Sequence, residues 1–221
     1  RGHNTFSNCT YGLYIRDVGD TVPGTAINMT VHPFDGEAGY SYRGVGDTYE
    51  AYFRHTSNTA PSVLFRSRGH DLLWQSVRLR SGTDTVSGNL DAPAVVSGTS
   101  VSYTGVYPGV TLRLDMCMGQ LKESFVLQGA AAVPGPGDAV FDCSVWYDGS
   151  ALTVVADGAP RFEDFETGGP VEFWSGGSRV FFLPAPDAED AAGASVACTY
   201  VCRFGDHRLD VAVVVPRTYL D

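Results

Sequence analysis

The residue types that most often carry out chemistry are scattered along this chain of 221 residues. Zinc needs three or four converging His, Cys or carboxylate ligands, yet the histidines occur singly, and the nearest approach to a ligand set is Cys198, Cys202 and His207. A serine nucleophile is often presented by a G-x-S-x-G turn, which the sequence lacks, and Gly176-Gly177-Ser178 is better interpreted as an ordinary turn. The phosphate-binding patterns GxxxxGK[ST] and GxGxxG are missing too. We therefore expect no catalytic residue, no metal site and no bound cofactor.

Two groups of carboxylates are the remaining candidates for catalysis or cation binding. They are Glu163, Asp164 and Glu166, and then Asp187, Glu189 and Asp190. Paired carboxylates can hydrolyse glycosides or bind calcium, but acidic surface loops are common, and we expect both groups to be solvated. Aromatic residues make up 12% of the chain, including Trp74, Trp146 and Trp174. Most of them are expected to fill a β-sheet core, and exposed ones could stack on sugar rings.

The cysteines are an odd set of five, so they cannot all pair within one chain. They are Cys9, Cys117, Cys143, Cys198 and Cys202. Cys198 and Cys202 share a strand pattern that places their Cα atoms roughly 13 Å apart, whereas a disulfide needs roughly 7 Å or less. One interpretation is five buried free thiols in a reducing compartment. The preferred one is an exported protein with one or two internal bridges, for example between Cys117 and Cys143, and a bond between chains through Cys9, Cys198 or Cys202.

Composition argues against two kinds of partner. The formal net charge of −10 and the pI near 4.8 argue against nucleic acid, because polyphosphate binding needs a basic surface. No window approaches 18 consecutive apolar residues, so no membrane-spanning helix is expected. The sequons Asn8-Cys9-Thr10 and Asn28-Met29-Thr30 make Asn8 and Asn28 candidates for glycosylation and give weak support to export.

The strand pattern is strongest between Val101 and Gln128. Apolar residues alternate with polar ones at Val110, Leu112, Leu114 and Met116. This period of two is typical of a strand with one buried face, and the chain returns as a second strand from Leu121 to Leu127. The preceding Pro108-Gly109 suits a type II turn, because proline presets φ at the first central position and glycine accepts a positive φ at the second. We predict a hairpin in which Leu112, Leu114 and Phe125 are core residues.

Short strands separated by turn residues are predicted along the rest of the chain. They cover residues 26–31, 48–54, 62–66, 72–80, 140–147, 152–156, 162–165, 171–174, 179–183, 196–204 and 208–215. Leu73, Gln75, Val77 and Leu79 are expected on one side of their strand. Asp148-Gly149-Ser150 predicts a hairpin turn, as does Gly205-Asp206.

The spacing of these strands predicts the fold class. Strands at intervals of roughly 8–12 residues, without a convincing helix, are typical of a sandwich or barrel. We expect an all-β fold of one or two antiparallel β-sandwiches, with an N-terminal β-rich domain at 1–98 and a β-sandwich at 99–221. Residues 81–100 are rich in Ser, Gly, Thr, Ala and Pro, which favours a linker or a crossing between sheets.

Several motifs of the second half resemble a known module. Tyr107-Pro108-Gly109-Val110, followed by Leu121-Lys122-Glu123-Ser124-Phe125-Val126-Leu127, resembles the Y-P-G-V-x-L … G-x-L-K-x-x-F-V-L hairpin of a β-sandwich module. That module occurs in large secreted prokaryotic cell-surface proteins, ahead of RHS/YD-repeat or bacterial β-propeller-repeat regions. Residues 180–186 and 190–193 are similar to its P-A-P … D-A-A-G segment, and residues 209–220 resemble its next strand. The resemblance implies an extracellular β-sandwich and implies no reaction.

These features favour a structural protein over an enzyme. We expect a non-enzymatic subunit of an extracellular or cell-surface assembly, such as a sheath, surface layer or filament. Its partners would be copies of itself, held by pairing of exposed strand edges and by disulfides between chains. The alternative is an extracellular module for adhesion or for binding a glycan or another ligand through an aromatic face.

Overall fold

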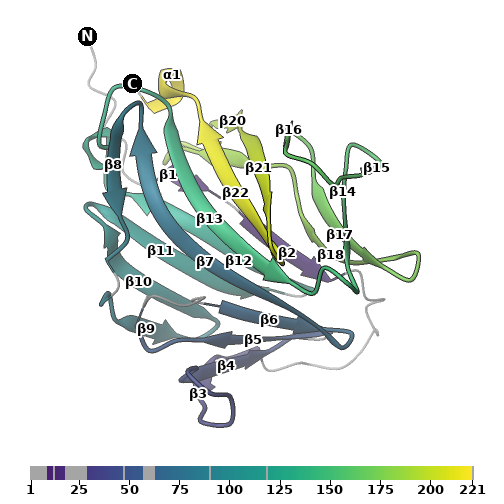
Figure 1. Ribbon diagram of the computed structural model, residues 1–221. Helices are drawn as coiled ribbons and strands as arrows, with labels where there is room; N and C mark the ends of the chain where they lie inside the picture. Colours follow the sequence, from purple (N-terminus) through teal and green to yellow (C-terminus); the bar gives the residue numbers. More distant parts are fainter. Residues whose placement is uncertain are drawn as a thin grey trace.

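A computed structural model describes residues 9–11, 13–17, 29–46, 48–56, 63–89, 91–117 and 119–220. The described chain is built almost entirely of strands, which form two antiparallel sheets (Figure 1). The predicted all-β class with sandwich-like sheets is therefore confirmed.

Within the described residues, the first sheet has 12 strands. Its main path follows the order β15 (Ala159–Pro160), β14 (Thr153–Ala156), β17 (Val171–Ser175), β18 (Ser178–Leu183), β2 (Leu13–Asp17), β12 (Gln120–Leu127), β1 (Cys9–Tyr11), β19 (Asp187–Glu189) and β20 (Ser195–Ala197). The other edge of β12 pairs with β11 (Val110–Cys117), which is followed by β10 (Ser100–Tyr107) and β9 (Ala94–Ser97).

The second sheet has 10 strands in the same described ranges. Its order is β16 (Phe165–Thr167), β21 (Thr199–Gly205), β22 (Arg208–Val215), β13 (Ala139–Tyr147), β7 (His70–Ser81), β6 (Val63–Ser67), β5 (Tyr49–Phe53), β4 (Tyr42–Val45) and β3 (His32–Pro33), and β8 (Asp84–Ser87) also pairs with β7. The helical segments are a 3-10 turn (Ala130–Ala132) and α1 (Arg217–Leu220).

The predicted central hairpin is confirmed by β11 and β12. These strands pair from Val110 opposite Leu127 to Cys117 opposite Gln120, without a register shift. Leu112, Leu114 and Phe125 are all buried, as expected from the alternation. Gly109 has a φ of 70°, the positive value that the turn after Pro108 requires.

The chain changes sheets several times, and two of these changes fall in segments that the sequence marks as turn-rich. β8 belongs to the second sheet and β9 to the first, so the predicted crossing between sheets lies within 81–100, flanked by two short strands. The predicted hairpin at Asp148-Gly149-Ser150 is wrong, because β13 and β14 lie in different sheets. The turn itself is present: Ser150 N donates to Asp148 Oδ1 at 2.9 Å, and Leu152 N donates to the Asp148 carbonyl at 2.8 Å. A local turn pattern cannot tell a hairpin from a connection between sheets.

The predicted side for Leu73, Gln75, Val77 and Leu79 is also wrong. The register of β7 against β13 shifts between Asp142 and Cys143, because Val77 is an extra residue at a bulge. Leu79 is therefore buried whereas Val77 is 41% exposed. Trp74 lies on the face of β7 opposite to Leu73 and Gln75, and it is a core residue.

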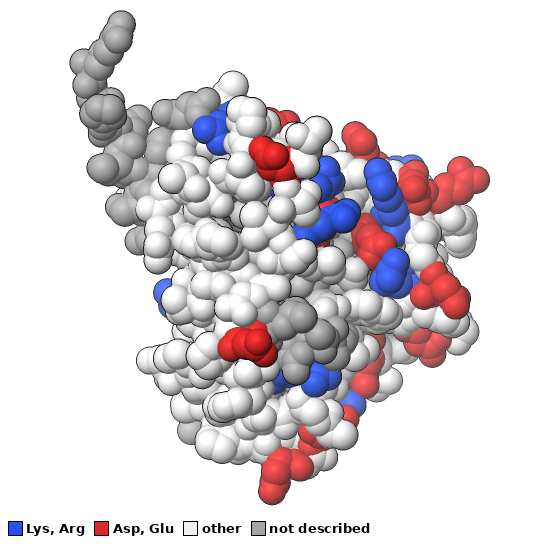
Figure 2. Space-filling model, turned by 60° about the vertical axis from the view of Figure 1, so that its left-hand side comes forward, with Lys and Arg blue, Asp and Glu red and all other residues white. Residues whose placement is uncertain are grey.

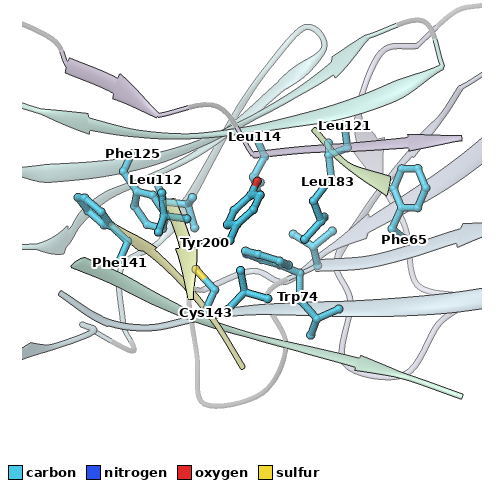
Figure 3. Close-up of a cluster of buried hydrophobic side chains, with 14 of the residues drawn as sticks. Phe65, Trp74, Leu112, Leu114, Leu121, Phe125, Phe141, Cys143, Leu183 and Tyr200 are labelled. Atoms are coloured by element: carbon cyan, nitrogen blue, oxygen red, sulfur yellow. The ribbon is translucent and has the colours of Figure 1, made fainter. Parts of the chain in front are cut away.

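The core lies between the sheets and is one continuous cluster of buried side chains. Figure 3 shows side chains from β11, β12 and β18 meeting those from β6, β7, β13 and β21. The rings of Phe125 and Phe141, from opposite sheets, stack with centroids 4.6 Å apart, and Phe65 meets Phe181 edge to face at 5.7 Å.

Strands from both sides of residue 98 contribute to each sheet. β7 pairs with β13, and β2 pairs with β12. If residues 1–98 and 99–221 folded separately, neither of these strand pairs could form, and the common core would be divided between the two parts.

Candidate functional site

The residues closest to a zinc-ligand pattern do not converge. Cys198 and Cys202 lie in the core, whereas His207 lies in the exposed turn between β21 and β22. Across the described ranges, no group of three or more His, Cys, Asp or Glu side chains is arranged to hold a metal ion.

The cysteines with described side chains are all free thiols. They are Cys117, Cys143, Cys198 and Cys202. The suggested bridge between Cys117 and Cys143 is therefore absent. Cys143 and Cys202 both face Val211 from neighbouring strands, so their Cα atoms are separated by two strand spacings, roughly 10 Å, which is too far for a disulfide.

Cys198 and Cys202, two of the candidates for a bond between chains, are both buried. Cys202 lies on β21, which is flanked by β16 and β22, and Cys198 directly precedes this strand. Burial, together with nearby Asp187 for Cys198 and Asp164 for Cys202, raises the pKa of both thiols to about 12. Two of the three candidates for a bond between chains are thus inaccessible. The side chain of Cys9 and the glycosylation candidates Asn8 and Asn28 lie outside the described residues.

The carboxylate groups are surface features. Glu163, Asp164 and Glu166 are exposed, and Asp164 Oδ1 accepts a hydrogen bond from Phe204 N at 2.9 Å. Asp190 Oδ1 closes a turn by accepting hydrogen bonds from Ala192 N at 2.8 Å and from Ala194 N. Asp164 therefore binds a backbone amide of β21 and Asp190 closes a turn, whereas Asp187 is half-buried on β19.

One carboxyl group, Glu123 on β12, is buried between the sheets. Trp74 Nε1 donates to its Oε1 at 2.7 Å, and Ser76 Oγ donates to the same oxygen at 3.3 Å. The other oxygen, Oε2, is buried without a hydrogen-bond partner, and so is the nearby Tyr107 hydroxyl. Burial raises the pKa of Glu123 to about 8, although the hydrogen bonds from Trp74 and Ser76 act in the opposite direction. Since this acid lies in the packed core, its protonation state affects the stability of the fold.

The outer face of the second sheet carries a separate aromatic cluster. Tyr40, Tyr52 and Leu64 are buried there, and Phe34 and Leu73 pack against them. Tyr52 on β5 lies at its centre, because its ring centroid is 5.5 Å from that of Phe34 and 6.3 Å from that of Tyr40. Phe34 and Tyr40 come from the loop between β3 and β4, so this loop lies against the sheet.

Arginines stack on these rings. The Cζ atom of Arg54 lies 4.8 Å from the Tyr40 ring centroid, and those of Arg66 and Arg43 lie 5.3 and 5.7 Å from the Tyr52 centroid. Stacking on a ring face stabilises a guanidinium and fixes its plane. The cations of this cluster are therefore held in defined orientations.

Carboxylates hold two of these arginines from the side. Asp71 accepts two hydrogen bonds from Arg66, at 2.7 and 2.9 Å, and this pairing raises the pKa of Arg66 further above its ordinary value. Glu50 accepts from Arg43 and from the Tyr52 hydroxyl. Burial alone would raise the pKa of Glu50, but these two hydrogen bonds bring it below its ordinary value.

An open groove of about 440 Å³ lies beside this cluster. We call it the aromatic groove, and it is lined by Phe34, Asp35, Glu37, Ala38, Gly39, Tyr40, Ser41, Arg54, His55 and Thr56. The His55 ring stacks on Tyr42 with centroids 6.2 Å apart, and Nδ1 lies 3.3 Å from the Tyr42 hydroxyl. The groove therefore combines aromatic surface with carboxylates, a guanidinium and an imidazole that can donate or accept hydrogen bonds.

The sequence interpretation did not single out any residue of this groove. A signal was present, since an aromatic residue lies within two positions of an arginine in Tyr42-Arg43, Tyr52-Phe53-Arg54 and Phe65-Arg66. Glu123 could also have been found, because it shares the phase of Leu121 and Phe125, which are core residues.

None of the family models, curated proteins or solved structures compared with this chain matches it. The described residues contain no helix long and apolar enough to cross a membrane.

Proposed function

We propose that this chain is a non-enzymatic extracellular module that binds a glycan in the aromatic groove. The observation that carries the proposal is the juxtaposition of the Phe34 ring with Arg54, His55 and Glu37 in one open groove, where the buried Tyr40 ring stacks against Arg54. Sugar rings present apolar C–H faces between hydroxyl groups. A recognition site for them needs aromatic surface for the faces and both donors and acceptors for the hydroxyls, and the groove offers all three.

The surroundings of the groove favour a rigid binding surface. Arg54 stacks on Tyr40 and donates from one terminal nitrogen to the Gly39 carbonyl at 3.1 Å, which ties the β3–β4 loop to β5. Tyr52 packs under the same loop. A ligand would meet groups that are already ordered, so it would lose little affinity to the ordering of side chains. The resemblance to cell-surface modules supports an extracellular location.

The test is binding of a panel of neutral oligosaccharides, such as cello-, chito- and manno-oligosaccharides, measured by calorimetry. We expect Phe34→Ala and His55→Ala each to weaken the binding of the recognised sugar about tenfold or more, as truncation of a central contact does in other interfaces. Phe162→Ala is the matched control, because Phe162 is 77% exposed and lies outside the groove. It should leave affinity unchanged.

Two results would contradict the proposal. One is a folded protein, with an unfolding temperature near that of the parent, that binds no member of the panel. The other is binding that Phe34→Ala and His55→Ala leave intact, because the sugar would then occupy another surface.

A second candidate is a self-associating subunit of a surface assembly, which one edge strand favours. Among the described strands, β9 pairs only with β10, although Ala94 N at its start donates to the His55 carbonyl at 2.8 Å. β9 is uncharged and carries Val95, which is 56% exposed. An apolar edge without charge is open to pairing with another chain. If this edge associates, Val95→Lys should shift the protein from an oligomer to a monomer in sedimentation, and a parent that is already monomeric at high concentration would remove this candidate.

A further inference from the structure

A second groove, of about 270 Å³, lies over strands β7, β13, β22 and β21. We call it the arginine groove, and its charged residues are Arg78, Arg80, Arg203, Arg208, Asp142 and Asp210. Four arginines and two aspartates give it a formal charge of +2, in a chain whose net charge is −10. On the face shown in Figure 2, basic and acidic side chains lie interleaved on the right-hand side.

Two aspartates orient three of the arginines. Asp142 accepts hydrogen bonds from the Nε atoms of both Arg78 and Arg80, the latter at 2.9 Å. Asp210 accepts from a terminal nitrogen of Arg208 at 2.9 Å and from Ser144 Oγ at 2.6 Å. Asp142 therefore holds two guanidinium groups of β7 from the neighbouring β13, whereas Asp210 holds that of Arg208 within β22.

Many of the N–H donors of these arginines make no hydrogen bond to a carboxylate. Each guanidinium has about five N–H donors, whereas Arg78, Arg80 and Arg208 together make four hydrogen bonds to carboxylates. Arg203 is exposed opposite Asp210 in the β21–β22 register, and it has no ion pair within the described part of the chain. The positive charge of Arg203 is thus available to a ligand.

We propose that the arginine groove binds a carboxylated sugar of an acidic polysaccharide, with Arg203 and Arg78 as ligands of its carboxylate. A guanidinium matches a carboxylate in a planar, two-point contact. The carboxylates of Asp142 and Asp210 accept hydrogen bonds from sugar hydroxyls, and Val77, Val201 and Ala212 give an apolar floor for the C–H face. Sulfate and phosphate esters fit less well, because their additional anionic oxygens would have to face the same two aspartates.

The position of this groove also suits a polymer. Tyr52, Leu64, Leu73, Trp146 and Arg208 lie opposite one another in successive strands of the second sheet. This row connects the aromatic cluster to the arginine groove over four strand spacings, roughly 19 Å. An oligosaccharide lying along this row would reach from the arginine groove to the aromatic cluster. Binding at the arginine groove does not depend on the proposed function of the aromatic groove.

The experiment measures binding of oligogalacturonate to the full chain by calorimetry, beside its methyl ester and a sulfated dextran of similar length. We expect oligogalacturonate to bind and the uncharged ester to bind at least about tenfold more weakly. Arg203→Gln and Arg78→Gln should each weaken binding about ten- to hundredfold. The control is Arg113→Gln, which removes the same charge from β11 in the other sheet, where the arginine is 53% exposed. It should leave affinity unchanged.

Unfolding temperatures of all three variants show whether a loss of binding comes from a loss of folding. Arg203→Gln is the most informative, since that side chain is exposed and makes no ion pair with the described residues. The proposal is overturned if oligogalacturonate does not bind. It is also overturned if sulfated dextran binds more tightly, or if Arg113→Gln weakens binding as much as Arg203→Gln, because either result would mean unspecific attraction of anions.

Discussion

Replacing Glu123 by glutamine should change how the stability of this protein depends on pH. The folded-state pKa of this carboxyl is about 8, against 4.5 for an exposed glutamate. Because the folded state holds the proton more tightly, Glu123 contributes most to stability below pH 4.5, and that contribution is lost as the pH rises to about 8. The difference of about 3.5 between the two pKa values is equivalent to about 5 kcal/mol in the free energy of unfolding.

The Glu123→Gln variant removes this titration and keeps the oxygen that accepts from Trp74 and Ser76. Its amide group lacks a partner where Glu123 Oε2 lacks one, so a cost of about 1–3 kcal/mol that does not vary with pH is expected. Between pH 5 and pH 7.5, the unfolding free energy of the variant should rise relative to the parent by about 3 kcal/mol.

Urea unfolding at half-unit pH intervals measures this difference. Glu166→Gln is the matched control, since it makes the same chemical change on an exposed position of β16, and it should follow the parent at every pH. If the difference between Glu123→Gln and the parent stays constant across this range, the carboxyl does not carry a proton in the folded core, and the reasoning fails.

Three further predictions follow from the core, the thiols and the acidic surface. Leu114→Ala should lower the free energy of unfolding by about 2–5 kcal/mol, by loss of buried surface and creation of a cavity, and an unchanged urea midpoint would mean that Leu114 is not a core residue. Alkylation of the native protein should modify the half-buried Cys117 and spare Cys143 and Cys202 until the chain unfolds, because burial raises the pKa of both thiols. Mass spectrometry of the digest measures the order of modification, and labelling of Cys143 or Cys202 before Cys117 would contradict this prediction. Pure protein should not hydrolyse polysaccharides, and an activity lost in Glu163→Gln or Asp164→Asn would contradict the interpretation of these exposed acids as a solvated surface.

The parts of the fold that the sequence predicts are those set by local patterns. The alternation of Val110, Leu112 and Leu114 and the short turn after Cys117 specify the β11–β12 hairpin within one stretch of chain. The bulge at Val77 is different, because it depends on how β7 meets β13, which lies more than 60 residues later. Asp148 would close a turn both in a hairpin and in a connection between sheets. Only the packing of the following strand decides which sheet that strand joins.

In the candidate sites too, local patterns predict the strands, whereas the pairing of distant strands sets which residues meet. Strands at 48–54 and 62–66 are predicted from the sequence, but the register that sets Tyr52 opposite Leu64 and brings Arg66 over the Tyr52 ring is not local. The arginine groove collects residues from four strands, and β7 and β22 are separated by more than 120 residues. Neither groove could be assembled from spacing alone.

The placement of β1 and β2 has a consequence for how the chain folds as it is synthesised. β2 lies between β12 and β18, and β1 lies between β12 and β19, so every strand partner of these early segments is made more than 100 residues later. At about 5–20 residues per second, β2 waits roughly ten to thirty seconds for β18 to leave the ribosome. Contacts of such long sequence separation also form slowly after release. β1 and β2 are therefore translated long before their partners, and the nascent chain must keep them from pairing elsewhere in the meantime.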